Sequence, residues 1–181
     1  VDGREPVGLP LKTHSLILRA RSRFFAAMFD SNLLEQSSGE INIVCPKRTI
    51  VKDMLMHMYG AVDSIPWVKY TEEDLQALAC LTHYYNYSSL FDVVKRKIYR
   101  RISVSSCVRW FKWSQREMPS VHLAHVIAAQ VRDYWQELSL DYREDFEELC
   151  HPDYLAVIYG YVEIDEYEEE EERAANKSIK V

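Results

Sequence analysis

Glycine is scarce in this chain, with five residues among 181. Neither a glycine-rich loop that could cradle a phosphate nor a dinucleotide fingerprint is present in the sequence. Long apolar runs are missing as well, since none approaches the roughly 18 residues that are needed to cross a bilayer. These absences argue against a nucleotide-binding enzyme and against a membrane-spanning chain.

The four cysteines are far apart, form no CxxC pair and stand in no secretory context. Reduced, structural thiols are the better interpretation of this pattern, which predicts a cytoplasmic or nuclear protein. Hydrophobic residues make up 48% of the chain and aromatic residues 12%, as in an ordinary globular protein with a real core.

The net charge of −6 is concentrated at the end of the chain. From Glu163 onward, eight acidic residues stand against three basic ones, whereas the preceding residues are almost neutral, with 19 basic and 20 acidic side chains. Like charges repel, so we expect segment 163–181 to be disordered or to form a solvated helix end. The functional alternative is an acidic tail that docks on a basic partner. A nearly neutral body does not favour nucleic-acid binding.

Two residue pairs could in principle carry chemistry. His122 and His125 stand three apart on a predicted helix, but no cysteine or acid follows at a spacing that would complete a metal site. Cys150-His151 could pair a thiol with its base, yet Pro152 makes this a loop-to-helix junction without an oxyanion-hole motif. We therefore predict no catalytic, cofactor-binding or metal-binding residue, and no enzymatic activity.

The segment His14–Phe29 is the most informative stretch of the sequence. Apolar residues at helical spacing predict two short helices, interrupted at Arg21-Ser22. Ser22 is well placed as an N-cap, because its hydroxyl can accept a hydrogen bond from a freed backbone N–H. Helices this short are marginal alone, so both must dock on a larger body.

Local signals also place the elements that follow. Alternating residues predict a half-buried strand over Leu9–Thr13 and a short strand over Ile41–Val44. Pro46 is expected to open a helix that Gly60 closes, and 61–70 reads as a loop with room for one edge strand. A capping box starting at Thr71 predicts another helix.

Helical patterns continue to the acidic segment. Apolar residues predict that Leu75, Leu78, Ala79 and Thr82 share one helix face, and that Leu90, Val93, Val94 and Ile98 share the next. Further helices are expected to begin at Ser105 or Ser106, after Pro119-Ser120, over Tyr142–Leu149 and at Pro152.

The pattern resembles that of the BTB (POZ) domain. The family's run of a His, a Leu and a small residue before Arg-Ser, then an aromatic residue and Met-Phe, stands here within 14–29, and Met58-Tyr59-Gly60 resembles the family's Tyr before Thr-Gly. The resemblance implies an α+β fold, a small sheet flanked by helices. The later helices resemble the start of an all-α BACK extension. The expected domains are a BTB/POZ domain at 1–101, a BACK-like extension at 102–162 and an acidic tail at 163–181.

The resemblance also implies a partner. BTB domains that recruit the cullin-3 ubiquitin-ligase scaffold carry an apolar residue, any residue and an acid after the Met-Phe helix, and Leu33-Leu34-Glu35 stands there. Tyr59 matches an aromatic residue that often lines the same surface. On the alternative reading, Leu33 merely covers the core and Glu35 is solvated.

Two functions follow from the resemblance. One is a substrate adaptor of a cullin-3 RING ubiquitin ligase, with the substrate bound by a region outside this chain. The other is a BTB oligomerisation scaffold, in a structural complex or a transcriptional regulator, without a ligase. Most BTB domains dimerise through an N-terminal helix and first strand, and we expect these pieces to precede Val1, because the sequence begins within a hairpin.

Overall fold

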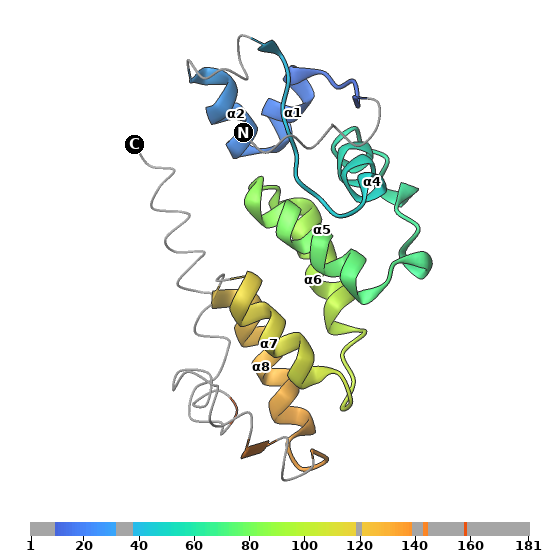
Figure 1. The fold of residues 1–181 in the computed structure, drawn as a ribbon, viewed down its shortest axis with the longest axis vertical. Helices are drawn as coiled ribbons and strands as arrows, with labels where there is room; N and C mark the ends of the chain where they lie inside the picture. Colours follow the sequence, from blue (N-terminus) through green and yellow to red (C-terminus); the bar gives the residue numbers. More distant parts are fainter. Residues whose placement is uncertain (1–9, 32–37, 119–120, 139–142, 145–157, 159–181) are drawn as a thin grey trace. The chain divides into compact units, whose positions relative to one another are not determined.

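The computed structural model describes residues 10–31, 38–118, 121–138, 143–144 and 158. The chain divides into two compact units, Val1–Ile98 and Tyr99–Val181. Within the described ranges every regular element is helical, and Figure 1 shows the helices in chain order.

The first unit begins with two short helices, α1 (Ser15–Arg21) and α2 (Arg23–Asp30), which pack against each other (Figure 1). Ser22 separates them with extended backbone angles, and its hydroxyl accepts a hydrogen bond from the Phe25 N–H at 3.1 Å. The predicted N-cap is therefore confirmed. The extended Ser22 changes the direction of the chain between the two helices, and Phe25 and Met28 of α2 are buried.

The predicted strands are not found in the described part of the chain. Residues 10–13 and 41–44 run without regular secondary structure. Burial does alternate as expected, with Ile41 and Ile43 half-buried and the residues after each exposed. A strand also needs a neighbour that completes its hydrogen-bond ladder, and no described segment provides one for 41–44. The alternation thus predicted burial correctly, while the sheet is not confirmed. The start of the predicted hairpin lies outside the described residues.

Helix α4 (Arg48–Met58) begins two residues later than expected, since Arg48 rather than Pro46 is the first helical residue, after an extended Lys47 at the N-cap. Gly60 directly follows the C-cap Tyr59 and closes the helix as predicted, with a φ of +91° that favours glycine. Two 3-10 turns follow, η1 (Val62–Ser64) and η2 (Trp67–Lys69), in place of the edge strand considered for this loop.

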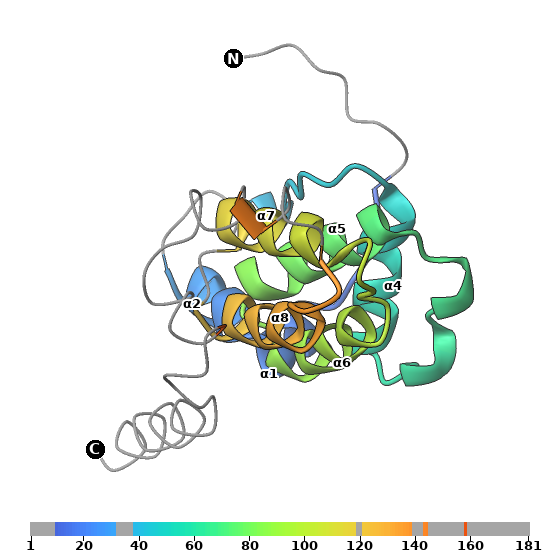
Figure 2. The same cartoon turned by 90° about the horizontal axis from the view of Figure 1, so that it is seen from below.

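Helices α5 (Glu72–Tyr84) and α6 (Ser88–Tyr99) follow, with Asn86 turning the chain between them at a φ of +47°. The capping box at the start of α5 is confirmed, because Thr71 and Asp74 each accept a hydrogen bond from the other's backbone N–H. Helix α4 packs against α5, as seen in Figure 2. The predicted inward-facing residues are buried, except for half-buried Val93.

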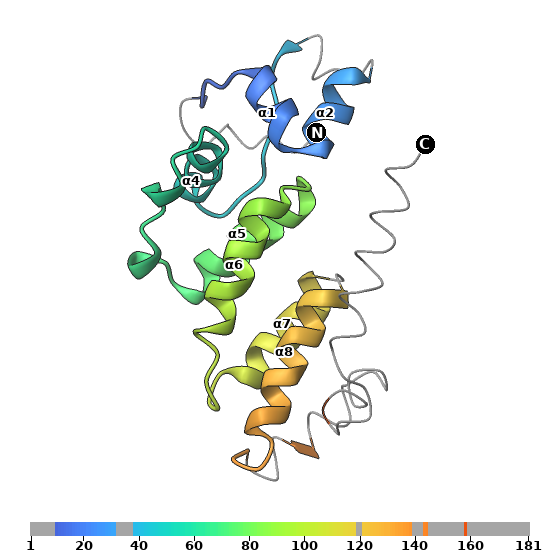
Figure 3. The same cartoon turned by 180° about the vertical axis from the view of Figure 1, so that it is seen from behind.

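The second unit contains α7 (Cys107–Glu117) and α8 (Val121–Tyr134), which lie side by side (Figure 3). Helix α7 starts directly after Ser106, one of the two predicted starts. Its Trp110 and Phe111 are fully buried, as are Ile127 and Val131 of α8. The helices predicted over Tyr142–Leu149 and from Pro152 fall largely or wholly in ranges that are not described.

Candidate partner-binding surface

Tyr59 lies at the point where α4 ends. It is the C-cap of the helix, and its backbone N–H donates to the Leu55 carbonyl oxygen at 3.1 Å. Gly60 then takes the chain away from the helix axis. The Tyr59 side chain is 42% exposed, so the helix end presents an aromatic ring at the surface. A partner could reach this ring without any rearrangement of the core.

The Tyr59 hydroxyl is held by His14, which lies 45 residues earlier in the chain and is the N-cap of α1. The His14 backbone N–H donates to the hydroxyl oxygen at 2.7 Å, and the His14 Nδ1 lies 2.8 Å from the same oxygen. The two ring centroids are 5.9 Å apart. The start of α1 and the end of α4 are thereby joined at the surface.

The sequence did not predict this pair. The family pattern predicts Tyr59 as a partner-binding residue, whereas His14 enters the sequence analysis only as the first residue of the family's run within 14–29. A separation of 45 residues leaves no periodic signal, so only the fold brings the two together.

The predicted partner-binding residues Leu33, Leu34 and Glu35 lie outside the described residues. The structure does describe the helix that leads to them. Helix α2 ends at Asp30, whose carboxylate pairs with Arg19 of α1. The Ser31 hydroxyl donates to the Met28 carbonyl oxygen at 2.7 Å. The last described residue before the predicted segment is therefore anchored to its own helix.

Several exposed apolar side chains belong to the same elements as Tyr59. Leu16 of α1 is 74% exposed, Met56 lies one turn before Tyr59 and is 41% exposed, and Val62 of η1 is 54% exposed. Scattered exposed apolar residues are normal on protein surfaces. They belong to α1, α4 and η1, of which α4 contacts both α1 and η1.

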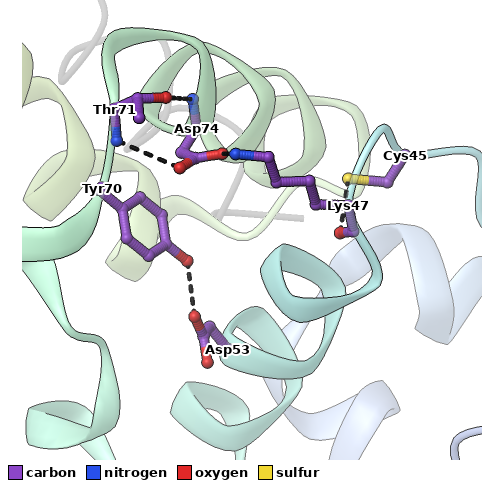
Figure 4. A network of polar contacts seen from close by, with 6 residues as sticks. All are labelled: Cys45, Lys47, Asp53, Tyr70, Thr71 and Asp74. Carbon is purple, nitrogen blue, oxygen red and sulfur yellow. Dashed lines mark hydrogen bonds and ion pairs between the residues drawn. The ribbon is translucent and has the colours of Figure 1, made fainter.

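A polar network fixes the opposite end of α4 (Figure 4). The Lys47 ammonium pairs with the Asp74 carboxylate at 2.6 Å, and the Tyr70 hydroxyl donates to Asp53 at 2.8 Å. The hydrogen bond from Lys47 is the main cause that lowers the pKa of Asp74. Burial, with the Asp53 carboxylate nearby, raises the pKa of Tyr70. Asp74 is thus held ionised and Tyr70 neutral, which suits a structural clamp between α4 and α5.

A second polar pair is buried between α4 and the turn after α5. His57 is 7% exposed, and its Nδ1 lies 2.6 Å from the Tyr87 hydroxyl. Burial, aided by the charge of Arg21, lowers the pKa of His57. The neutral imidazole is therefore the form that suits the folded chain. The sequence does not predict this pair either, because its residues are 30 positions apart.

The two residue pairs considered for chemistry are described only in part. No group of three or more His, Cys, Asp or Glu side chains that could hold a metal ion occurs among the described residues. His125 is buried within α8, and Cys150-His151 lies in a range that is not described. Burial raises the pKa of the thiols of Cys45 and Cys107. Thiols held protonated in this way are poor nucleophiles.

Among the described residues, no helix has both the length and the apolar character that a membrane span requires.

Several known proteins are similar in sequence to this chain. The Kelch repeat and BTB domain-containing protein 4 of Homo sapiens is 29% identical over 149 residues, which are 79% of this chain and 26% of that protein. The Kelch repeat protein M-T8 of Myxoma virus is 27% identical over 143 residues, 74% of this chain and 26% of the viral protein. Kelch-like protein 40 of Xenopus tropicalis is 26% identical over 105 residues, 58% of this chain and 16% of that protein. The chain thus spans about a quarter or less of the length of these relatives.

The family itself is settled by a match over more than half of the sequence. The profile of the BTB/POZ domain matches residues 6–102, which include α1, the Ser22 break, Tyr59 and the capping box of α5. The resemblance drawn from the sequence is confirmed for this part, whereas a BACK extension stays a prediction. The chain belongs to the BTB/POZ family of protein-interaction domains.

Proposed function

We propose that this chain is the scaffold-binding part of a substrate adaptor for a cullin-3 RING ubiquitin ligase. The observation that carries the proposal is the exposed Tyr59 ring, held by His14 at the junction of α1 and α4. Helix α2 packs on α1 and leads directly into Leu33-Leu34-Glu35. BTB domains of the cullin-binding type are recognised by an aromatic residue and an apolar-x-acid segment. In this chain the aromatic residue, Tyr59, follows α4, and the apolar-x-acid segment follows α2.

Each residue has a distinct role in this proposal. Leu33 is the apolar anchor that enters a pocket of cullin-3, and Glu35 fixes the register through hydrogen bonds. Leu34 stands between the two in the same partner-binding segment, and Tyr59 widens the contact. The adaptor carries out no chemistry. It acts by proximity, because it holds a target lysine near a ubiquitin-loaded enzyme.

The rest of the chain supports this role. Residues 1–101 form the BTB part, and residues 102–162, which include α7 and α8, form a BACK-like extension that enlarges the contact with cullin-3. The name of the similar human protein combines Kelch repeats with a BTB domain, and a repeat region of this kind outside the chain would bind the substrate.

Binding of cullin-3 to a double variant tests the proposal. Leu33→Ala with Glu35→Ala should weaken binding to purified cullin-3 by more than tenfold in calorimetry, because both the anchor and the charged contact are removed. The matched control changes Val68, which is 98% exposed on η2, and the exposed Asp63 to alanine. This control should bind like wild type. Equal binding by wild type and by the Leu33/Glu35 variant would contradict the proposal, as would a wild-type chain that does not bind cullin-3.

One observation favours the oligomerisation scaffold as a second candidate function. Leu16 is 74% exposed on α1, a large apolar side chain that self-association could cover. Sedimentation of the chain with and without cullin-3 separates the two functions. The scaffold would be favoured if the chain is a dimer that does not bind cullin-3 and if Leu16→Lys converts this dimer to a monomer.

A further inference from the structure

The His14–Tyr59 contact joins two residues that are both exposed at the surface. Hydrogen bonds between groups that water can reach add little to folding stability, because water replaces the lost partner. The His14 side chain also does not stabilise its own helix as a cap, since it makes no capping hydrogen bond to α1. Folding stability alone therefore does not explain why the two residues are joined.

The arrangement of donors and acceptors restrains the Tyr59 hydroxyl from two sides. The backbone N–H of His14 can only donate, so the hydroxyl oxygen accepts this bond. The hydroxyl keeps one proton to donate, and Nδ1 of a neutral imidazole with its proton on Nε2 accepts it at 2.8 Å. Two bonds from one residue leave the ring little freedom to rotate away from the junction of α1 and α4.

Such restraint matters for binding. A surface side chain that must become ordered in a complex loses conformational entropy, which weakens the affinity. A ring that is already fixed avoids this loss. Met56, one turn before Tyr59 on α4, is an exposed apolar side chain that a partner covering the ring could also contact.

We propose that His14 is a positioning residue for partner binding, which holds the exposed Tyr59 ring in its binding orientation before the partner arrives. This inference rests on the proposed function, because it concerns the same cullin-3 surface. The inference adds His14, which lies outside the apolar-x-acid segment, to the residues that determine binding, and His14 acts through Tyr59.

A series of variants in the full chain tests the inference with purified cullin-3 as the probe. His14→Ala should weaken binding about three- to tenfold, the size expected when one side chain must be ordered on binding. His14→Asn is the conservative variant, because its Oδ1 can accept the hydroxyl proton close to the place of Nδ1, and it should restore most of the affinity. In a Tyr59→Phe background, which lacks the hydroxyl, His14→Ala should have no further effect.

A second measurement reports on the ring without any partner. The aromatic carbons of Tyr59, followed by NMR relaxation in the free chain, should show an ordered ring in wild type and in His14→Asn, and a mobile ring in His14→Ala. A role in stability alone would leave the ring order and the coupling with Tyr59→Phe unexplained. Unfolding of each variant in urea shows whether the fold is kept.

The outcomes separate the inference from the proposed function. If wild type binds cullin-3 and Tyr59→Ala weakens binding while His14→Ala binds as tightly as wild type, the positioning role is wrong and the function stands. A Tyr59 ring equally ordered with and without His14 overturns the positioning role whatever cullin-3 does. If wild type does not bind cullin-3 at all, the proposed function fails, and the positioning role for this partner fails with it.

Discussion

The Ser22 hydroxyl donates a hydrogen bond to the backbone carbonyl oxygen of Tyr85, 63 residues further along the chain. The same hydroxyl accepts a bond from the Phe25 N–H at 3.1 Å, and Ser22 is 2% exposed. One small side chain thus begins α2 and also ties it to the residue that follows α5. The break between the first two helices is therefore a tertiary contact as well as a local cap.

Replacement of Ser22 by alanine should destabilise the first unit by about 2–4 kcal/mol. Loss of an N-cap costs about 1 kcal/mol, and a buried carbonyl left without its donor costs about 1–3 kcal/mol. Urea unfolding followed by circular dichroism measures the change. Ser64→Ala is the matched control, because its hydroxyl bonds only to the Ala61 carbonyl oxygen at an exposed turn. We expect that control to stay within about 0.5 kcal/mol of wild type, and equal losses in the two variants would contradict the role of Ser22.

Phe25 should carry more of the stability than its neighbour Phe24. The Phe25 side chain is fully buried, and its ring stacks on Tyr85 with centroids 4.9 Å apart and planes 11° apart. Phe25→Ala should cost about 3–5 kcal/mol, the usual loss for a buried aromatic residue. Phe24 is half-buried and meets Tyr85 edge-on, so Phe24→Ala should cost less than half as much in the same unfolding experiment. A reversed order would show that the junction is packed differently.

Features with a local signal were predicted well from the sequence. The N-cap at Ser22, the capping box at Thr71 and the end of α4 at Gly60 each depend on residues within one turn of one another. The buried faces of α5 and α6 followed from helical periodicity for the same reason.

Features that depend on distant partners were missed or misread. The alternation over Ile41–Val44 describes which side chains are covered, and it cannot say whether a neighbouring strand completes the ladder. His14 and Tyr59 are 45 residues apart, and His57 and Tyr87 are 30 apart. Tyr59 could be picked from the family pattern, but its restraint by His14 could not, because no spacing rule joins residues that only the fold brings together.

The His57–Tyr87 pair predicts a loss of stability in mild acid. The native pKa of His57 is lowered by burial and by the charge of Arg21, whereas an unfolded histidine titrates near 6.5. The unfolded state therefore binds more protons as the pH falls below about 6.5, and the free energy of unfolding decreases until the native pKa is passed. Urea unfolding of wild type at pH values between about 8 and about 5, on both sides of the unfolded pKa near 6.5, measures how the free energy of unfolding changes with pH.

Two variants assign that slope to His57. His57→Gln keeps a polar side chain that cannot titrate, so the stability should change less with pH between neutral and mildly acidic conditions. Arg21→Gln leaves His57 buried and removes only the second cause of its shift, so the slope should shrink by a smaller amount. If His57→Gln retains the full slope of wild type, a different group is responsible.

The Lys47–Asp74 pair should contribute stability that is lost only in strong acid. The hydrogen bond from Lys47 lowers the pKa of Asp74 below its ordinary value of 3.8. The contribution is therefore fully present above the unfolded pKa and disappears as the pH falls through the lowered native pKa. Asp74→Asn retains an oxygen for the Thr71 N–H and removes the charge. At neutral pH this change should cost about 1 kcal/mol, and the cost should vanish in acid.

Removal of the other partner tests whether the ion pair is the cause. Lys47→Met should produce a similar loss at neutral pH, and the double variant with Asp74→Asn should add little to either single change, because both remove the same interaction. Lys95→Met is the control, since Lys95 pairs with Asp92 three residues away on α6 at 2.9 Å. Such a pair within one helix is worth about 0.2–0.5 kcal/mol. Fully additive losses at Lys47 and Asp74 would mean that the clamp between α4 and α5 depends on something other than their contact.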